Sequence, residues 1–215
     1  MAILKPKSNR RALSAQRTKN KLFSTALDLF MKYGFDQVTI EDITQSAGLS
    51  KGTFYVYFKS KESILLEVFH QIDHRYEDVF QDIPENMSAR ERILLLIDTM
   101  ANYCAHDVGL PFMKIVYANQ ISDSKDPIPI LNDSSRTLYR IAREAVVLGK
   151  QAHTLPDYPD DEFTEMIVRF ARSILYDWCL YDGSFDLEKE AHHYFSILLD
   201  SFEALAQHGT PQTRS

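Results

Sequence analysis

The chain is poor in the residues that several classes of functional site require. Only seven of its 215 residues are glycine, which leaves little room for a Gly-rich phosphate loop, and the sequence has no nucleophile elbow or ordered catalytic constellation. Its two cysteines, Cys104 and Cys179, lack CxxC spacing and lie in apolar helical context, which favours buried free thiols in a reducing compartment. We therefore expect a protein that is not an enzyme and uses no cofactor.

Long hydrophobic runs are also absent. No segment approaches the roughly 18 consecutive apolar residues of a transmembrane helix, and no apolar stretch follows the basic N-terminus as it does in a signal peptide. Hydrophobic residues make up 45% of the chain and charged residues 25%, which is ordinary for a globular protein. These patterns predict a soluble cytoplasmic protein with no membrane partner.

The charges are divided unevenly along the chain. Residues 1–61 contain eleven Lys/Arg and four Asp/Glu, a net charge of +7, which leaves 13 Lys/Arg and 26 Asp/Glu, a net charge of −13, for residues 62–215. A basic N-terminal part suggests a polyanionic partner, and the acidic remainder suggests a second role.

Helical periodicity runs along the whole chain, without convincing strands. Helices are predicted over residues 22–33, 40–47, 50–58, 60–80, 93–104, 111–121, 138–148, 163–181 and 191–205. Thr39 and Asp42 match a capping box, Ser50 and Ser60 are suited to be N-caps, and Gly48 lies in a tight turn. The fold is therefore predicted to be all-α, with about nine helices.

The segment GLSKGTFYVYFKSKE, Gly48–Glu62, crowds four aromatic residues beside three lysines. Short helices joined by a glycine-containing turn form a helix-turn-helix, whose second helix enters the DNA major groove. Phe54 and Phe58 are four residues apart and are expected to face inward and seal the core. On the outer face, bases are expected to meet Lys51, Thr53 and Val56, and a close backbone approach is expected at Gly52. Phosphates are expected at the N-terminal end of the helix, at Ser50, and at Tyr55, Tyr57, Lys59 and Lys61.

The stretch TIEDITQSAGLSKGTFYVYFKSKESIL, Thr39–Leu65, resembles the DNA-binding signature of the TetR family of bacterial transcriptional regulators, and the resemblance extends over about residues 15–70. It implies phosphate contacts from Thr39, Tyr55, Tyr57 and Lys61, and base-facing positions for Lys51, Gly52, Thr53 and Val56. A larger or polar residue is frequent in the family where Val56 stands, so weak base readout is implied there. The last two predicted helices resemble the family's dimerisation bundle, which implies a homodimer.

The remaining helices offer candidate effector-binding residues. Apolar and polar side chains suited to such a pocket are Met100, Tyr103, Phe112, Met113, Tyr117, Tyr139, Met166, Arg169, Phe170 and Trp178. The same residues are equally suited to an ordinary core, and Arg169 belongs to a polar stripe that fits a solvated face. His70, Asp73 and His74 have a spacing that could bind zinc, although paired histidines are common on solvated helices, and we predict no metal.

The sequence favours a ligand-responsive transcriptional regulator, a repressor that a small-molecule effector releases from a palindromic operator. The alternatives are an effector-independent DNA-binding protein and an enzyme with a DNA-binding tether. The predicted organisation is a flexible basic arm at 1–14, a helix-turn-helix domain at 15–62, an effector-binding and dimerisation domain at 63–207, and a flexible tail at 208–215. An effector between the later helices is expected to move the helix that starts at Ser60 and so change the separation of the two recognition helices.

Overall fold

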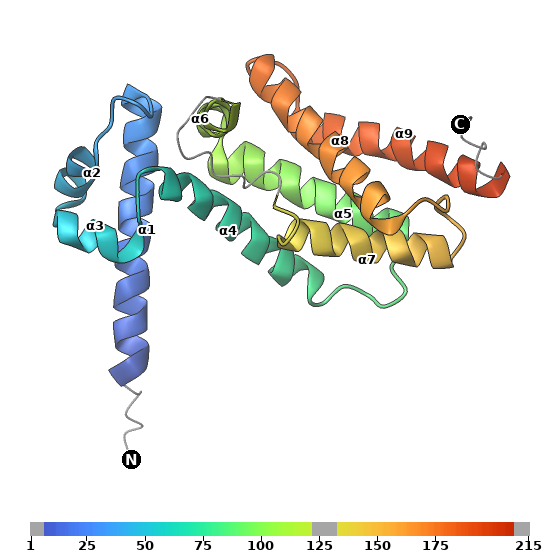
Figure 1. The fold of residues 1–215 in the computed structure, drawn as a ribbon, viewed down its shortest axis with the longest axis horizontal. Coiled ribbons are helices and arrows are strands. Elements are labelled where there is room, and N and C mark those ends of the chain that lie inside the picture. The colour runs from blue at the N-terminus through green and yellow to red at the C-terminus, as the bar shows by residue number, and fades with distance from the viewer. Residues whose placement is uncertain (1–6, 122–132, 209–215) are drawn as a thin grey trace. The chain divides into compact units, whose positions relative to one another are not determined.

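The computed structural model describes residues 7–121 and 133–208, and within these ranges every regular element is helical (Figure 1). The elements are α1 Lys7–Tyr33, α2 Ile40–Ala47, α3 Lys51–Tyr57, α4 Glu62–Phe80, α5 Ala89–Asn102, a π-helical turn Tyr103–Val108, α6 Leu110–Ile121, α7 Thr137–Gln151, α8 Asp160–Leu180 and α9 Leu187–His208. The all-α prediction is confirmed for the described residues. Residues 1–6 of the predicted arm and 209–215 of the predicted tail lie outside them.

Two compact units divide the chain inside α4. We call the described residues up to 68 the head, and residues 69–121 with 133–208 the body. The sequence places this boundary a few residues earlier, between 62 and 63. Each unit has its own buried apolar side chains.

The head is built around the C-terminal half of α1. Leu22, Ala26 and Phe30 are buried at helical spacing and pack with Ile43 and Phe54 from the two following helices. Figure 1 shows α2 and α3 beside this half of α1, while its N-terminal half extends past them. That half begins at Lys7, so residues 7–14 are helical although the sequence suggests a flexible arm.

Capping hydrogen bonds set the ends of the short head helices. The Thr39 hydroxyl accepts the Asp42 N–H at 3.1 Å and the Asp42 carboxylate accepts the Thr39 N–H at 2.8 Å, which confirms the predicted capping box. Gly48 ends α2 in the left-handed conformation, with φ of 64°, which glycine adopts at little cost. At the start of α4 the Ser63 hydroxyl donates to the Ser60 carbonyl at 2.6 Å and accepts the Ser60 N–H at 3.1 Å. Ser60, the predicted N-cap, takes part in these two bonds through its backbone.

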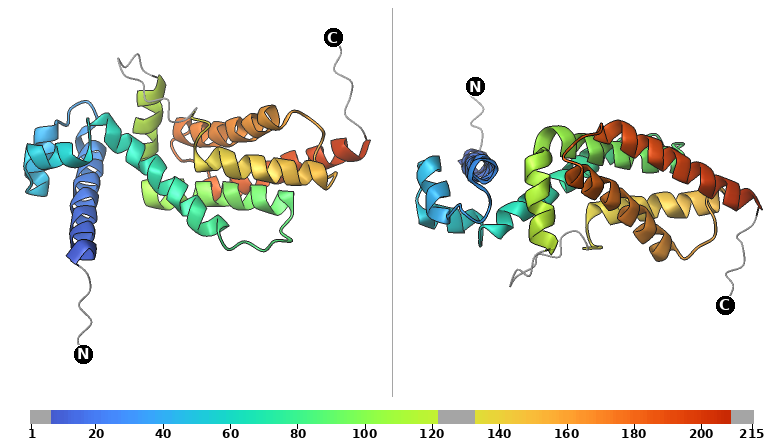
Figure 2. Two further views of the ribbon diagram at one scale, coloured as in Figure 1. Left: turned by 60° about the horizontal axis from the view of Figure 1, so that its bottom comes forward. Right: turned by 90° about the horizontal axis from the view of Figure 1, so that it is seen from above.

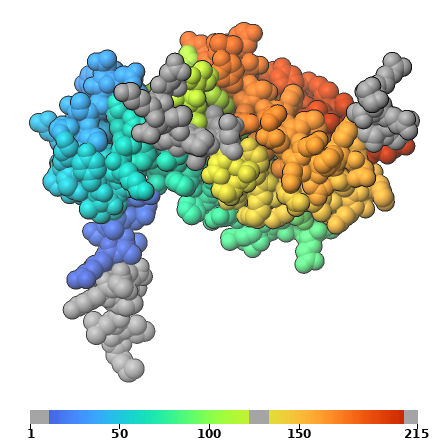
Figure 3. All heavy atoms as spheres, viewed as in Figure 1, coloured from blue at the N-terminus to red at the C-terminus, as the bar shows by residue number. Residues whose placement is uncertain are grey.

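The body packs α5 between α7 and α9, and α7 against α8. Both views in Figure 2 show α8 and α9, orange and red, lying side by side. The surface facing the viewer in Figure 3 is formed in the body largely by α7 and α8. Cys104 and Cys179 are buried free thiols, as predicted, and burial raises the pKa of the Cys104 thiol to about 12.

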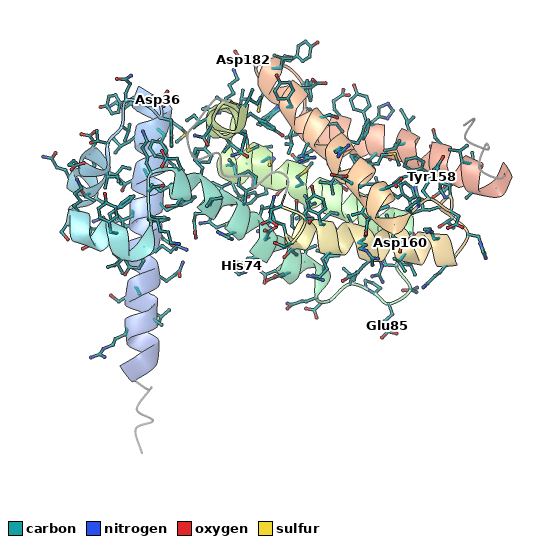
Figure 4. The ribbon with its side chains drawn as sticks, viewed as in Figure 1. Asp36, His74, Glu85, Tyr158, Asp160 and Asp182 are labelled. Atoms are coloured by element: carbon teal, nitrogen blue, oxygen red, sulfur yellow. The ribbon has the colours of Figure 1, made fainter. Side chains whose placement is uncertain are left out.

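A buried ion pair joins α4 to the start of α7 within the body. The Arg136 guanidinium donates to both Asp73 carboxylate oxygens, at 3.0 and 2.9 Å, and lies 4.9 Å from the centre of the Phe69 ring. Asp73 is thus paired with arginine, while His74 lies at the surface of α4 (Figure 4). Among the described residues no group of three or more His, Cys, Asp and Glu is placed to hold a metal ion.

Among the helices of residues 7–121 and 133–208, none combines the length and the apolar composition that a membrane-spanning segment requires.

Candidate nucleic-acid interface

The recognition helix α3 divides its aromatic residues between the core and the surface. Phe54 and Phe58 are 0% and 3% exposed, and their ring centres lie 5.6 Å apart. Tyr55 and Val56 are 51% and 75% exposed. The predicted inward orientation of Phe54 and Phe58 is therefore confirmed. Of the other predicted positions, Thr53 and Tyr57 are half-buried and the rest of α3 is exposed, and their DNA contacts remain predictions.

The N-terminal end of α3 is organised by Ser50. Its hydroxyl accepts the Thr53 N–H at 3.1 Å and lies 2.9 Å from the Thr53 hydroxyl, which confirms Ser50 as the N-cap. Lys51 and Gly52 follow at exposed positions, and a Cβ added at Gly52 would meet only the Ser50 hydroxyl, at 3.7 Å. A base edge therefore has open access to this end of the helix.

Lys51 has a partner that the sequence analysis does not identify. Its ammonium group donates to the carboxylate of Glu41 on α2. The two residues are ten positions apart and belong to different helices, so neither helical spacing nor a motif points to the pair. Only the turn between α2 and α3 brings them together.

Lys61 is engaged within the head itself. Its ammonium donates to the carbonyls of Phe35 at 2.6 Å and Val38 at 3.1 Å, and lies 4.2 Å from the centre of the Phe35 ring. Lys61 therefore fixes the turn between α1 and α2, a role additional to the predicted phosphate contact. Lys59 is exposed and forms no ion pair within the described residues, which makes it the simpler candidate for a phosphate.

A second head lysine joins α1 to α4. Lys19 lies 2.6 Å from the carboxylate of Glu67, and Glu67 is among the few buried charged residues. Removing one partner from a buried pair leaves the other charge without compensation. The pair thus holds α1 and the start of α4 as one unit with the recognition helix.

The candidate effector residues do not line one cavity. Met166, Arg169 and Phe170 line a groove of about 630 Å³ on α8. Tyr139 lines an adjoining groove of about 650 Å³ over α7 and α8, which shares Glu162 and Glu165 with the first. The other six are buried in the body: Met100, Tyr103, Phe112, Met113, Tyr117 and Trp178. The Tyr117 hydroxyl, for example, donates to the Arg172 carbonyl at 3.1 Å. A single effector pocket formed by all ten residues remains a prediction.

Comparison with known proteins gives matches in the head and along the chain. Residues 22–68 match the model of the family described as bacterial regulatory proteins, tetR family. The fatty acid metabolism regulator protein of Bacillus subtilis is 31% identical over 91 residues, which span 42% of this chain and 47% of that protein. The transcriptional regulator AcrR of Shigella flexneri is 24% identical over 208 residues, covering 87% of this chain and 90% of that protein.

Solved structures resemble the fold over most of the chain. The structure of FadR from Bacillus subtilis in complex with stearoyl-CoA has a TM-score of 0.66 at 21% identity, and the match covers 86% of this chain and 96% of that one. The structure of reduced NemR from E. coli has a TM-score of 0.63 at 19% identity, and the match covers 84% and 96%. At these identities the likeness shows the fold alone.

Base contacts from α3 and phosphate contacts from the residues that follow it are expected to have separable effects on DNA binding. Thr53→Ala should weaken binding to a selected DNA site by about 1–3 kcal/mol while changing binding to random DNA little, because a base contact discriminates sequences. Lys59→Ala should weaken both DNAs similarly and lower the slope of log affinity against log salt by about one unit, because one fewer counterion is released. Fluorescence anisotropy across a salt series measures both effects. Equal losses on both DNAs for Thr53→Ala would show that its assignment is wrong.

The match to a family model lies in the head, at residues 22–68. The family model covers α2, α3 and the parts of α1 and α4 that pack on them, and the capped, exposed recognition helix lies inside that range. The relatives and solved structures with regulator names then extend the likeness into the body. Residues 22–68 of the chain thus match the DNA-binding region of the tetR family of bacterial regulatory proteins, and the described helices share the fold of solved regulators.

Proposed function

We propose that this regulator is a homodimeric repressor that binds a palindromic operator and releases it when a small, largely apolar effector binds the body. The observation that carries the proposal is α3, which buries Phe54 and Phe58 and leaves the Lys51, Tyr55 and Val56 positions open to DNA. A two-fold dimer places two such helices about 34–36 Å apart, one turn of DNA. Because the two helices are related by a two-fold axis, the two DNA half-sites that they contact are related by the same axis, and the operator is palindromic.

The dimer surface is the outer face of α8 and α9. Two grooves that share Phe170 and Ser173 run along it. Large apolar side chains are exposed beside them: Met166, Tyr176, Leu180, Tyr181, Tyr194 and Ile197. Exposed apolar patches of this kind mark interaction sites, and a second copy offers the same two helices to form a four-helix bundle.

Ile197→Glu is expected to convert the dimer to monomers at low micromolar concentration. Ile197 is 50% exposed on α9, so the protomer tolerates the change, whereas in a dimer two unpaired carboxylates become buried at about 3–5 kcal/mol each. Light scattering on the purified protein measures the mass. A dimer that survives Ile197→Glu contradicts the proposed surface.

Two other variants separate dimer loss from unfolding. Ile121→Glu makes the same chemical change at an exposed isoleucine on α6, outside the proposed α8–α9 surface, and should leave the dimer intact. Phe202→Glu would not serve this purpose, because Phe202 is buried against Phe163 of its own protomer, with ring centres 4.9 Å apart.

The effector proposal is supported by the apolar body and by the relatives. The Bacillus subtilis relative is named a fatty acid metabolism regulator, and the FadR structure holds stearoyl-CoA. Long-chain acyl-CoA is therefore the first effector class to try. Release requires that the effector bind the DNA-incompetent state more tightly than the DNA-bound state.

Stearoyl-CoA is expected to change the fluorescence of Trp178 with saturation, because Trp178 is the single tryptophan of the chain and is buried in the body. The same titration should lower occupancy of the selected DNA site in fluorescence anisotropy. Coenzyme A without an acyl chain is the control and should do neither. A flat Trp178 signal with no DNA release excludes acyl-CoA as the effector class.

A further inference from the structure

Glu41 places a carboxylate beside the recognition helix. It is the second residue of α2, and its partner Lys51 is the first residue of α3. Both side chains are more than half exposed, and the Lys51 ammonium donates to the Glu41 carboxylate. This hydrogen bond lowers the pKa of Glu41, so the carboxylate is ionised at neutral pH.

The other acid nearby has the larger structural role, since Glu41 in the first turn of α2 favours the helix N-terminus only modestly. Asp42 is held in the capping box by the backbone and hydroxyl of Thr39. Glu41 lies outside that box, and an exposed ion pair such as Glu41–Lys51 contributes little to folding stability. The pair therefore calls for an explanation in terms of what Lys51 binds.

Lys51 is the single basic residue within α3. A free lysine at this position would attract phosphates of any DNA sequence, because phosphate contacts carry no sequence information. A lysine already neutralised by a carboxylate gains little from a random phosphate. It gains more where a base edge in the major groove offers acceptors, as guanine does with O6 and N7.

We propose that Glu41 is a specificity-determining residue of DNA binding. Its carboxylate stays paired with the Lys51 ammonium on random DNA, where only phosphates are in reach, and the pair opens at the operator, where Lys51 donates to base acceptors. Specificity is a difference between two affinities, and it increases when binding to the wrong partner is weakened. The proposal rests on the proposed function, since it presupposes that α3 reads an operator. It explains how Lys51 can contact bases without increasing affinity for all DNA.

Glu41→Gln tests the proposal, because glutamine keeps the shape and removes the charge. On random DNA the variant should bind about three- to tenfold more tightly near 0.1 M salt, with the slope of log affinity against log salt steeper by about one unit, as expected for one added phosphate contact. Operator affinity should rise less, so the ratio of operator to random affinity should fall. Fluorescence anisotropy on both DNAs across a salt series gives these values.

Two further variants isolate the mechanism. Asp28→Asn removes a carboxylate from the exposed face of α1, where Asp28 forms no ion pair within the described residues, and controls for the change in net charge. Adding Lys51→Gln to Glu41→Gln should abolish the gain on random DNA, because the freed lysine is its source. Circular dichroism checks that each variant stays helical.

The outcomes are distinct. A gain equal to that of Asp28→Asn, or a gain that persists without Lys51, overturns the proposal. So does a Glu41→Gln variant that loses operator affinity with random DNA unchanged, since Glu41 would then orient Lys51 instead of restraining it. Failure of the unmodified protein to prefer any DNA sequence contradicts the proposed function itself, and it is seen before any variant is compared.

Discussion

The burial of Phe54 and Phe58 is the interaction on which DNA recognition depends. A helix of seven residues is too short to be stable by itself, because nucleation costs more than so few hydrogen bonds return. Here two rings on one side fill the head core, and Ser50 caps the start. Because these interactions hold α3 from one side and one end, its opposite side needs no packing partner and stays available to DNA.

Paired charges on α4 give the second constraint. Glu67 is paired with Lys19 in the head, and Asp73 is paired with Arg136 in the body. Charges that are removed from water are tolerated when they are paired and hydrogen-bonded, and losing one partner is strongly unfavourable. One helix thus contributes a paired acid to each unit.

Local sequence patterns predicted much of the head. The capping box, the Ser50 cap and the inward rings depend on residues at most four positions apart, so their geometry follows from helix periodicity. The N-terminal half of α1 was missed because KSNRRALS has no apolar stripe and reads as a tail. The Glu41–Lys51 pair and the carbonyl contacts of Lys61 depend on a turn or on distant segments, and residue spacing carries no information about those. The effector residues remain a prediction, since a Met- or aromatic-rich helix has the same sequence pattern whether it lines a cavity or fills a core.

Two recognition helices, related by a two-fold axis, are proposed to read one operator. Selection of bound sites from a random DNA library by the purified full-length protein tests it most directly. The account predicts an inverted repeat whose half-site centres are separated by about 10–10.5 bp or a multiple of that spacing. Recovery of a single asymmetric site, or of sequences no different from the starting library, would contradict it.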